Sequence, residues 1–187
     1  MAYGSLIGDP GPELRALIVE RVPHRTPFPV EFGRASRRWG GGPVLVPHPA
    51  GAPVDGQLLV LNPRVALGQA VEALREREGM PSADGVVEVG QVGRCLVLAA
   101  SLPRNLPAPD LRPAALARRA AASVEAGPRN GVAYLRAVVG AGVCTPRTGA
   151  YVRAVLGLAG ADTLEDAERR LVALAEARNG GCPDGVG

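Results

Sequence analysis

Hydrophobic and polar residues alternate in two different rhythms along the chain. In the first hundred residues, short apolar runs such as 54–61 and 95–100 are bounded by Gly and Pro, which is typical of β-strands. Within this half, only residues 62–77 have the length and spacing of a full amphipathic helix. From Pro113 onward the spacing is helical throughout. It predicts helices over 113–125, 130–139, 148–158 and 164–177.

The strand-rich half determines the expected architecture. Several short strands in series favour a mixed or antiparallel sheet that curls towards a barrel, because a doubly wound parallel sheet would need regular crossover helices. Residues 13–20 are expected to form a short amphipathic helix, and residues 26–36 a half-buried strand. We therefore expect an α+β fold.

The composition changes at the Pro-rich stretch 101–113, after which no further strand is expected. We interpret the whole chain, residues 1–187, as one domain. It would consist of a β-rich core over 1–102, which holds the functional site, and a helical C-terminal extension over 111–178 that covers this core. Residues 179–187 are expected to fray.

Composition and charge narrow the classes of function. The net charge is only +3, and no basic run is interleaved with aromatic residues, so we expect no nucleic-acid partner. No apolar run approaches the length of a membrane span, and no signal peptide is visible, so we expect a cytoplasmic protein without a membrane partner. The cysteines are far apart and lack a C-x-x-C motif, which argues against a metal site or disulfide framework; they are Cys95, Cys144 and Cys182.

The opening segment Tyr3-Gly4-Ser5-Leu6 is a candidate binding turn. Gly4 has no Cβ, so the backbone can turn sharply there and approach a ligand closely. The N–H groups of Gly4, Ser5 and Leu6 can then point the same way and bind an oxyanion or a carboxylate. The alternative is an ordinary tight turn that ends a strand.

Glu78 is the candidate catalytic residue. Leu67, Val71 and Leu74 form the apolar stripe of the predicted helix, and Glu78 is the next position on this stripe. Burial and the helix C-terminus would both raise the pKa of this carboxyl, which suits a general base. The alternative is that the helix frays before Glu78 and that the side chain faces water.

Four segments, in this order, resemble a known family. Tyr3-Gly4-Ser5-Leu6 is similar to the signature that opens the γ-glutamylcyclotransferase fold, in particular its ChaC-like branch. Residues 54–61 resemble its central strand, and residues 74–79 resemble the helix end with the catalytic glutamate. Gly127-Pro128-Arg129-Asn130, followed by Tyr134, resembles the start of the ChaC C-terminal helix.

The resemblance implies a fold, a reaction and a set of site residues. The fold would be a mixed or antiparallel β-barrel with flanking helices, in a monomer or homodimer. The reaction would release 5-oxoproline from glutathione or another γ-glutamyl amine or peptide, without metal or organic cofactor. Glu78 matches the catalytic glutamate and would act as general acid and base. The residues implied to bind substrate are Tyr3, Gly4, Ser5, Leu6, Arg34 and Tyr134.

Some positions leave alternatives open. Arg34 can pair with a substrate carboxylate or be a surface arginine, and Tyr134 can cap the pocket or pack in the helical cover. The loop 37–42 can form a mobile wall around Trp39 or a solvated turn. Where ChaC-like proteins have Gly-Gly-Tyr, this chain has Gly-Met-Pro-Ser at 79–82, which puts glutathione specificity in doubt. A non-catalytic protein that binds a small carboxylate on the same fold is the alternative function.

Overall fold

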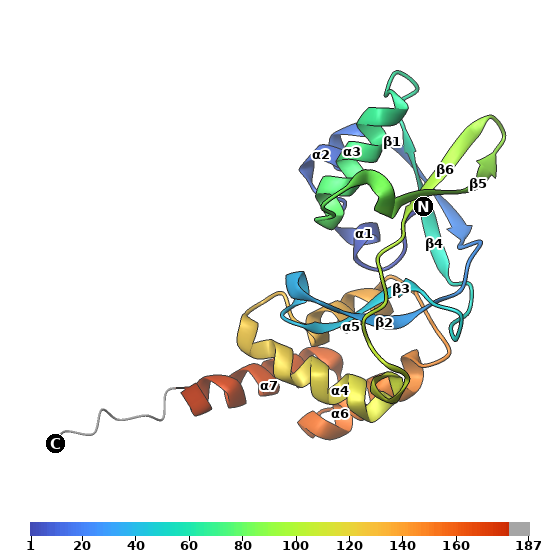
Figure 1. Cartoon of the computed structure of the whole chain (residues 1–187). Helices are drawn as coiled ribbons and strands as arrows, with labels where there is room; N and C mark the ends of the chain where they lie inside the picture. Colours follow the sequence, from blue (N-terminus) through green and yellow to red (C-terminus); the bar gives the residue numbers. More distant parts are fainter. Residues whose placement is uncertain (180–187) are drawn as a thin grey trace. The chain divides into compact units, whose positions relative to one another are not determined.

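A computed structural model describes residues 1–179 of the protein (Figure 1). The helices are α1 Ser5–Gly8, α2 Pro12–Leu17, α3 Leu67–Glu78, α4 Pro113–Ala122, α5 Gly131–Gly140, α6 Thr148–Ala159 and α7 Leu164–Asn179. The strands are β1 Ile18–Arg25, β2 Val30–Ser36, β3 Gly42–Pro47, β4 Asp55–Leu61, β5 Val86–Val92 and β6 Cys95–Ala100. The α+β class and the helices of the second half are confirmed. The expected frayed end and Cys182 lie outside the described residues.

The strands pair two by two. β1 pairs with β4 and β5 with β6, both antiparallel, and β2 pairs with β3. The N-terminal residues link two of these pairs: Ala2 and Gln57 exchange backbone hydrogen bonds of 2.7 and 2.9 Å, and the Met1 amino group donates to the Leu98 carbonyl at 2.6 Å. These residues therefore reach β4 on one side and β6 on the other.

The expected closure of the strands into a barrel is wrong for residues 1–179. The described strands form three separate two-stranded ladders. Outside these strands, isolated bridges pair Ala2 with Gln57 and Val30 with Ala52. A closed barrel would require ladder pairing between neighbouring strands all the way round.

The beginning of the chain differs from expectation in one element. The helix expected over 13–20 ends at Leu17, and the chain continues as strand β1 through Pro23. A proline has no N–H group to donate to a neighbouring strand, so it is tolerated where a strand pairs on one side only. β1 has β4 as its one partner in the sheet, which is the position that accepts Pro23.

Contacts between Cα atoms divide the described chain into two compact units. The first unit comprises residues 1–31, 45–104 and 137–146; the second comprises 32–44, 105–136 and the chain from 147 onward. That the whole chain is one domain, with a β-rich core and a helical extension, stays a prediction.

The core of the first unit joins the start of the chain to α3. Leu6, Leu14 and Leu74 are buried together, and Leu59 and Leu61 of β4 pack against them. α2 and α3 lie side by side in Figure 1 and are in contact. This apolar cluster holds the opening turn against the helix that ends at residue 78.

Helix α3 begins later than expected. The Asn62 side chain accepts a hydrogen bond from the Arg64 N–H at 3.0 Å, which forms a local turn instead of the first helical turn. The helix then begins at Leu67, whose side chain is 56% exposed and not part of the buried stripe. The buried residues of α3 are Ala73, Leu74 and Arg77.

In the second unit, helix α6 packs against α4 and against α7 (Figure 1). Tyr151 of α6 is fully buried, and its ring lies edge-on to that of Phe32, with centroids 5.0 Å apart. Burial raises the pKa of the Tyr151 hydroxyl. No helix over residues 1–179 has the length and apolar character needed to cross a bilayer.

The Tyr151 hydroxyl is buried without a hydrogen-bond partner among residues 1–179. Replacing it by Tyr151→Phe should raise the free energy of unfolding by about 1 kcal/mol, because an unsatisfied buried hydroxyl costs about 1–3 kcal/mol. Urea denaturation of both proteins measures this. A variant that is less stable than the wild type would show that the hydroxyl has a partner in solution.

Candidate functional site

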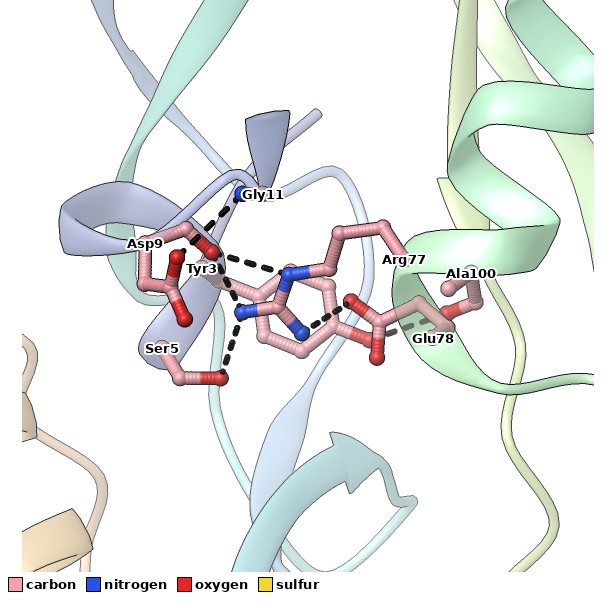
Figure 2. Close-up of polar contacts among 7 residues, drawn as sticks. All are labelled: Tyr3, Ser5, Asp9, Gly11, Arg77, Glu78 and Ala100. Atoms are coloured by element: carbon pink, nitrogen blue, oxygen red, sulfur yellow. Dashed lines mark hydrogen bonds and ion pairs between the residues drawn. The ribbon is translucent and has the colours of Figure 1, made fainter. Parts of the chain in front are cut away.

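A buried arginine on α3 organises the candidate site. The Arg77 side chain is only 4% exposed, and its guanidinium reaches across to the opening turn (Figure 2). Nε and Nη2 donate to the Asp9 carbonyl at 2.8 and 2.6 Å, and Nη2 also donates to Ser5 Oγ at 3.2 Å. Nη1 donates to Glu78 Oε1 at 3.2 Å. One cation therefore contacts both the opening turn, 68 residues away in the chain at Asp9, and the neighbouring Glu78 carboxylate.

The opening turn has the conformation that Gly4 allows. Gly4 has φ 66° and ψ −138°, a combination that residues with a Cβ rarely adopt. Directly after it, Ser5–Gly8 form the single turn α1, and the Asp9 N–H donates to the Ser5 carbonyl at 2.9 Å. The first N–H groups of a helical turn lack carbonyl partners inside the turn, so those of Ser5 and Leu6 remain suited to bind an anion. The Leu6 side chain itself is a core residue.

Glu78 is the last residue of α3, because Gly79 ends the helix. Gly79 adopts the left-handed conformation, φ 64°, and its N–H donates to the Glu76 carbonyl at 3.0 Å. The Glu78 side chain is 15% exposed, whereas that of Glu76 is 51% exposed and that of Glu72 also faces solvent beside Arg75. The helix therefore does not fray before Glu78, and the carboxylate is held in contact with Arg77.

The surroundings of Glu78 include a cation that periodicity does not reveal. The Arg77 guanidinium lies 3.2 Å from Oε1, and the Glu78 side chain is 15% exposed. The carboxylate is thus paired with a cation and partly accessible.

Tyr3 directly precedes Gly4 in the opening turn. Its hydroxyl donates to the Ala100 carbonyl at 3.0 Å, which links the opening segment to the end of β6 (Figure 2). Its ring lies edge-on to Phe28, with centroids 5.6 Å apart and planes at 76°. The position of Tyr3 is therefore set by a hydrogen bond at one end of the side chain and by ring packing along it.

The structure thus brings together Tyr3, Gly4, Ser5, Leu6 and Glu78 within the first unit. This arrangement offers a carboxylate as proton acceptor, a hydroxyl, backbone donors and a buried cation. Among residues 1–179, no group of three or more His, Cys, Asp or Glu side chains is arranged to hold a metal ion.

The other two predicted binding residues belong to the second unit. Arg34 lies on β2 and is half-buried. Tyr134 lies on α5, is 3% exposed, and packs edge-on against Trp39 with centroids 5.0 Å apart. The loop around Trp39 is a 3-10 turn at Arg37–Trp39. Contacts of Arg34 and Tyr134 with substrate stay predictions.

Arg77 is the site residue that sequence analysis missed. It lies three residues after Leu74 and four after Ala73, so helical spacing places it on the buried face. A charged residue at such a position usually has a partner, and this was the available signal. The hydrogen-bond acceptors of Arg77 could not be predicted from the sequence, because the Asp9 carbonyl is a backbone group 68 residues away.

Removing this cation should loosen the turn. Arg77→Met keeps much of the side-chain volume but removes the donors to Asp9, Ser5 and Glu78, and leaves the carboxylate without this cation. We expect the free energy of unfolding to fall by about 3 kcal/mol, as when one partner of a buried pair is removed. Urea denaturation measures the change.

The matched control is Arg64→Met, at an exposed position, which should change stability by less than about 0.5 kcal/mol. Equal stability of Arg77→Met and wild type would contradict the organising role of Arg77.

Comparison with other proteins adds no relative to this picture. No protein-family model, curated protein or solved structure matches the chain. The resemblance to γ-glutamylcyclotransferases, which is carried by short segments in a shared order, stays a prediction.

Proposed function

We propose that this protein is a γ-glutamylcyclotransferase of the ChaC-like kind, which releases 5-oxoproline from glutathione or another γ-glutamyl amine or peptide. The observation that supports this most directly is the contact of Arg77 with both the Glu78 carboxylate and Ser5 Oγ. Residue 78 and the opening turn belong to two of the four segments that carry the resemblance. The finer assignments, a γ-glutamylcyclotransferase-like fold, a cytoplasmic location and a monomer or homodimer, belong to the same proposal.

The proposed reaction needs a single proton carrier. A γ-glutamyl compound has an α-ammonium group that can reach its own γ-carbonyl carbon in a five-membered ring. Glu78 accepts one proton from the ammonium, and the freed amine attacks the γ-carbonyl to form the new C–N bond. Glu78 then returns this proton to the leaving nitrogen as the original C–N bond breaks. The second proton of the attacking nitrogen follows the same route, so that the lactam keeps one N–H and the leaving group departs as an ammonium. The step balances without oxidant, metal or organic cofactor.

The opening turn would bind charge on the substrate. The N–H groups of Gly4, Ser5 and Leu6 can donate to the substrate carboxylate or to the oxyanion that develops on the γ-carbonyl. Because nucleophile and electrophile belong to one molecule, holding the folded rotamer is a large part of catalysis. Tyr3, fixed by Ala100 and Phe28, would form a wall for that rotamer.

Arg77 has a positioning role in this proposal. Its bonds to Asp9 and Ser5 hold the turn, and its bond to Glu78 orients the carboxylate. The guanidinium thereby fixes the place of the carboxylate relative to the opening turn.

Glu78→Gln tests the proposed base. Glutamine keeps the size and the hydrogen bond from Arg77 but cannot accept a proton. We expect kcat for 5-oxoproline release to fall by about 10²–10⁴-fold, the usual contribution of a general acid–base group. Chromatographic quantification of 5-oxoproline from glutathione and from γ-glutamyl amino acids measures this.

The control is Glu76→Gln, an exposed glutamate two positions away that should leave kcat unchanged. Full activity of Glu78→Gln would remove this residue from the mechanism.

The alternative is a non-catalytic protein that binds a small carboxylate at the same turn. The same N–H groups support this alternative, because they can bind an anion without Glu78 acting as a base. If no γ-glutamyl compound turns over while 5-oxoproline raises the melting temperature of the wild type, the binding function replaces the enzymatic one.

A further inference from the structure

A pocket lies in the first unit, lined in part by Phe28, the ring partner of Tyr3. It measures about 820 Å³ and lies between the loop before β2, the loop after β3 and the segment after β6. Phe28 and Leu102 line it together with prolines from each of these three segments, and the polar side chains that line it are those of His48, Ser101 and Arg104. Its volume is in the range of small-molecule sites.

The walls of the pocket are preformed. Pro29, Pro47, Pro49 and Pro103 have fixed φ angles and no N–H group, so they present rigid apolar surface. Hydrogen bonds tie the loops to one another: the His48 N–H donates to the Pro29 carbonyl at 2.9 Å. Binding of an apolar ligand would therefore cost little free energy for ordering these loops.

The charge of the pocket is positive. Arg104 is the one Arg or Lys of the lining, and no Asp or Glu lines the pocket. No hydrogen bond or ion pair joins the Arg104 side chain to any other of residues 1–179. The His48 ring accepts a hydrogen bond from the Ala50 N–H at Nδ1, 3.0 Å. The lining thus favours an anion, and Arg104 can bind a carboxylate with two parallel hydrogen bonds.

Tyr3 connects this pocket to the candidate site. Its ring contacts Phe28 of the lining, and its hydroxyl binds the carbonyl of Ala100, the residue before Ser101 of the lining. Tyr3 therefore adjoins the pocket lining at two points, through the Phe28 ring and through the backbone next to Ser101.

We propose that this pocket binds the leaving part of the substrate, an apolar amino acid or short peptide whose carboxylate pairs with Arg104. The inference rests on the proposed function, in which the leaving amine departs from the γ-carbonyl. Apolar side chains of the leaving part contact Phe28, Leu102 and the prolines. Arg104 is then a specificity-determining residue, and the pocket selects acids over amides.

Binding tests the pocket without requiring turnover. The probe is N-acetyl-L-leucine, an acylated apolar amino acid, titrated calorimetrically and compared with N-acetyl-L-leucinamide. The wild type should bind the acid about tenfold more tightly than the amide, as expected for one charge-assisted pair. Arg104→Gln should lose this preference, whereas Arg94→Gln, at another exposed arginine of the same unit, should keep it. Equal affinities of wild type and Arg104→Gln for the acid, or no binding by the wild type, would overturn the proposal.

Turnover separates this inference from the proposed function. The wild type should show higher kcat/KM for γ-glutamyl-L-leucine than for γ-glutamyl-L-leucinamide, and Arg104→Gln should remove the difference while keeping activity on the amide. Turnover without that difference would exclude Arg104 from leaving-group selection. If neither compound turns over, the proposed function fails, and the titration alone decides whether the pocket binds apolar carboxylates.

Discussion

The buried guanidinium of Arg77 is the interaction on which the candidate site depends. A cation at 4% side-chain exposure is stable only with several acceptors, and here these are the Asp9 carbonyl, Ser5 Oγ and Glu78 Oε1. Meeting this requirement places the opening turn against the end of α3. The apolar cluster around Leu6 and Leu74 adds the hydrophobic contact that holds the two segments together.

The arrangement also explains how a paired carboxylate can be chemically useful. Glu78 keeps partial access to solvent while Arg77 contacts one of its oxygens, so the carboxylate is held in reach beside the opening turn. Tyr3 then connects this group to a proline-walled pocket through Phe28 and Ala100. In our proposal, the part of the substrate that cyclises and the part that leaves are bound on either side of this tyrosine.

Much of the fold follows from local patterns. The helices of the second half and strand β4 agree with the expected periodicity, because their apolar faces are long enough to show it. The predictions failed where local signals compete: the helix expected over 13–20 gives way to strand β1 at Ile18, and Asn62, the expected helix start, forms a turn. Closure of a barrel could not be decided locally, since it depends on pairing between segments far apart in the chain.

The sequence by itself determined the α+β class, the turn at Gly4 and the position of Glu78 at a helix end, since each depends on neighbours within a few residues. Only the tertiary structure decided that Arg77 bridges Ser5, Asp9 and Glu78, because those acceptors are brought together by folding across about seventy residues. The same holds for the pocket of Arg104, whose walls come from three separate loops. Chemistry of this kind depends on distances between remote segments, and periodicity contains no information about those distances.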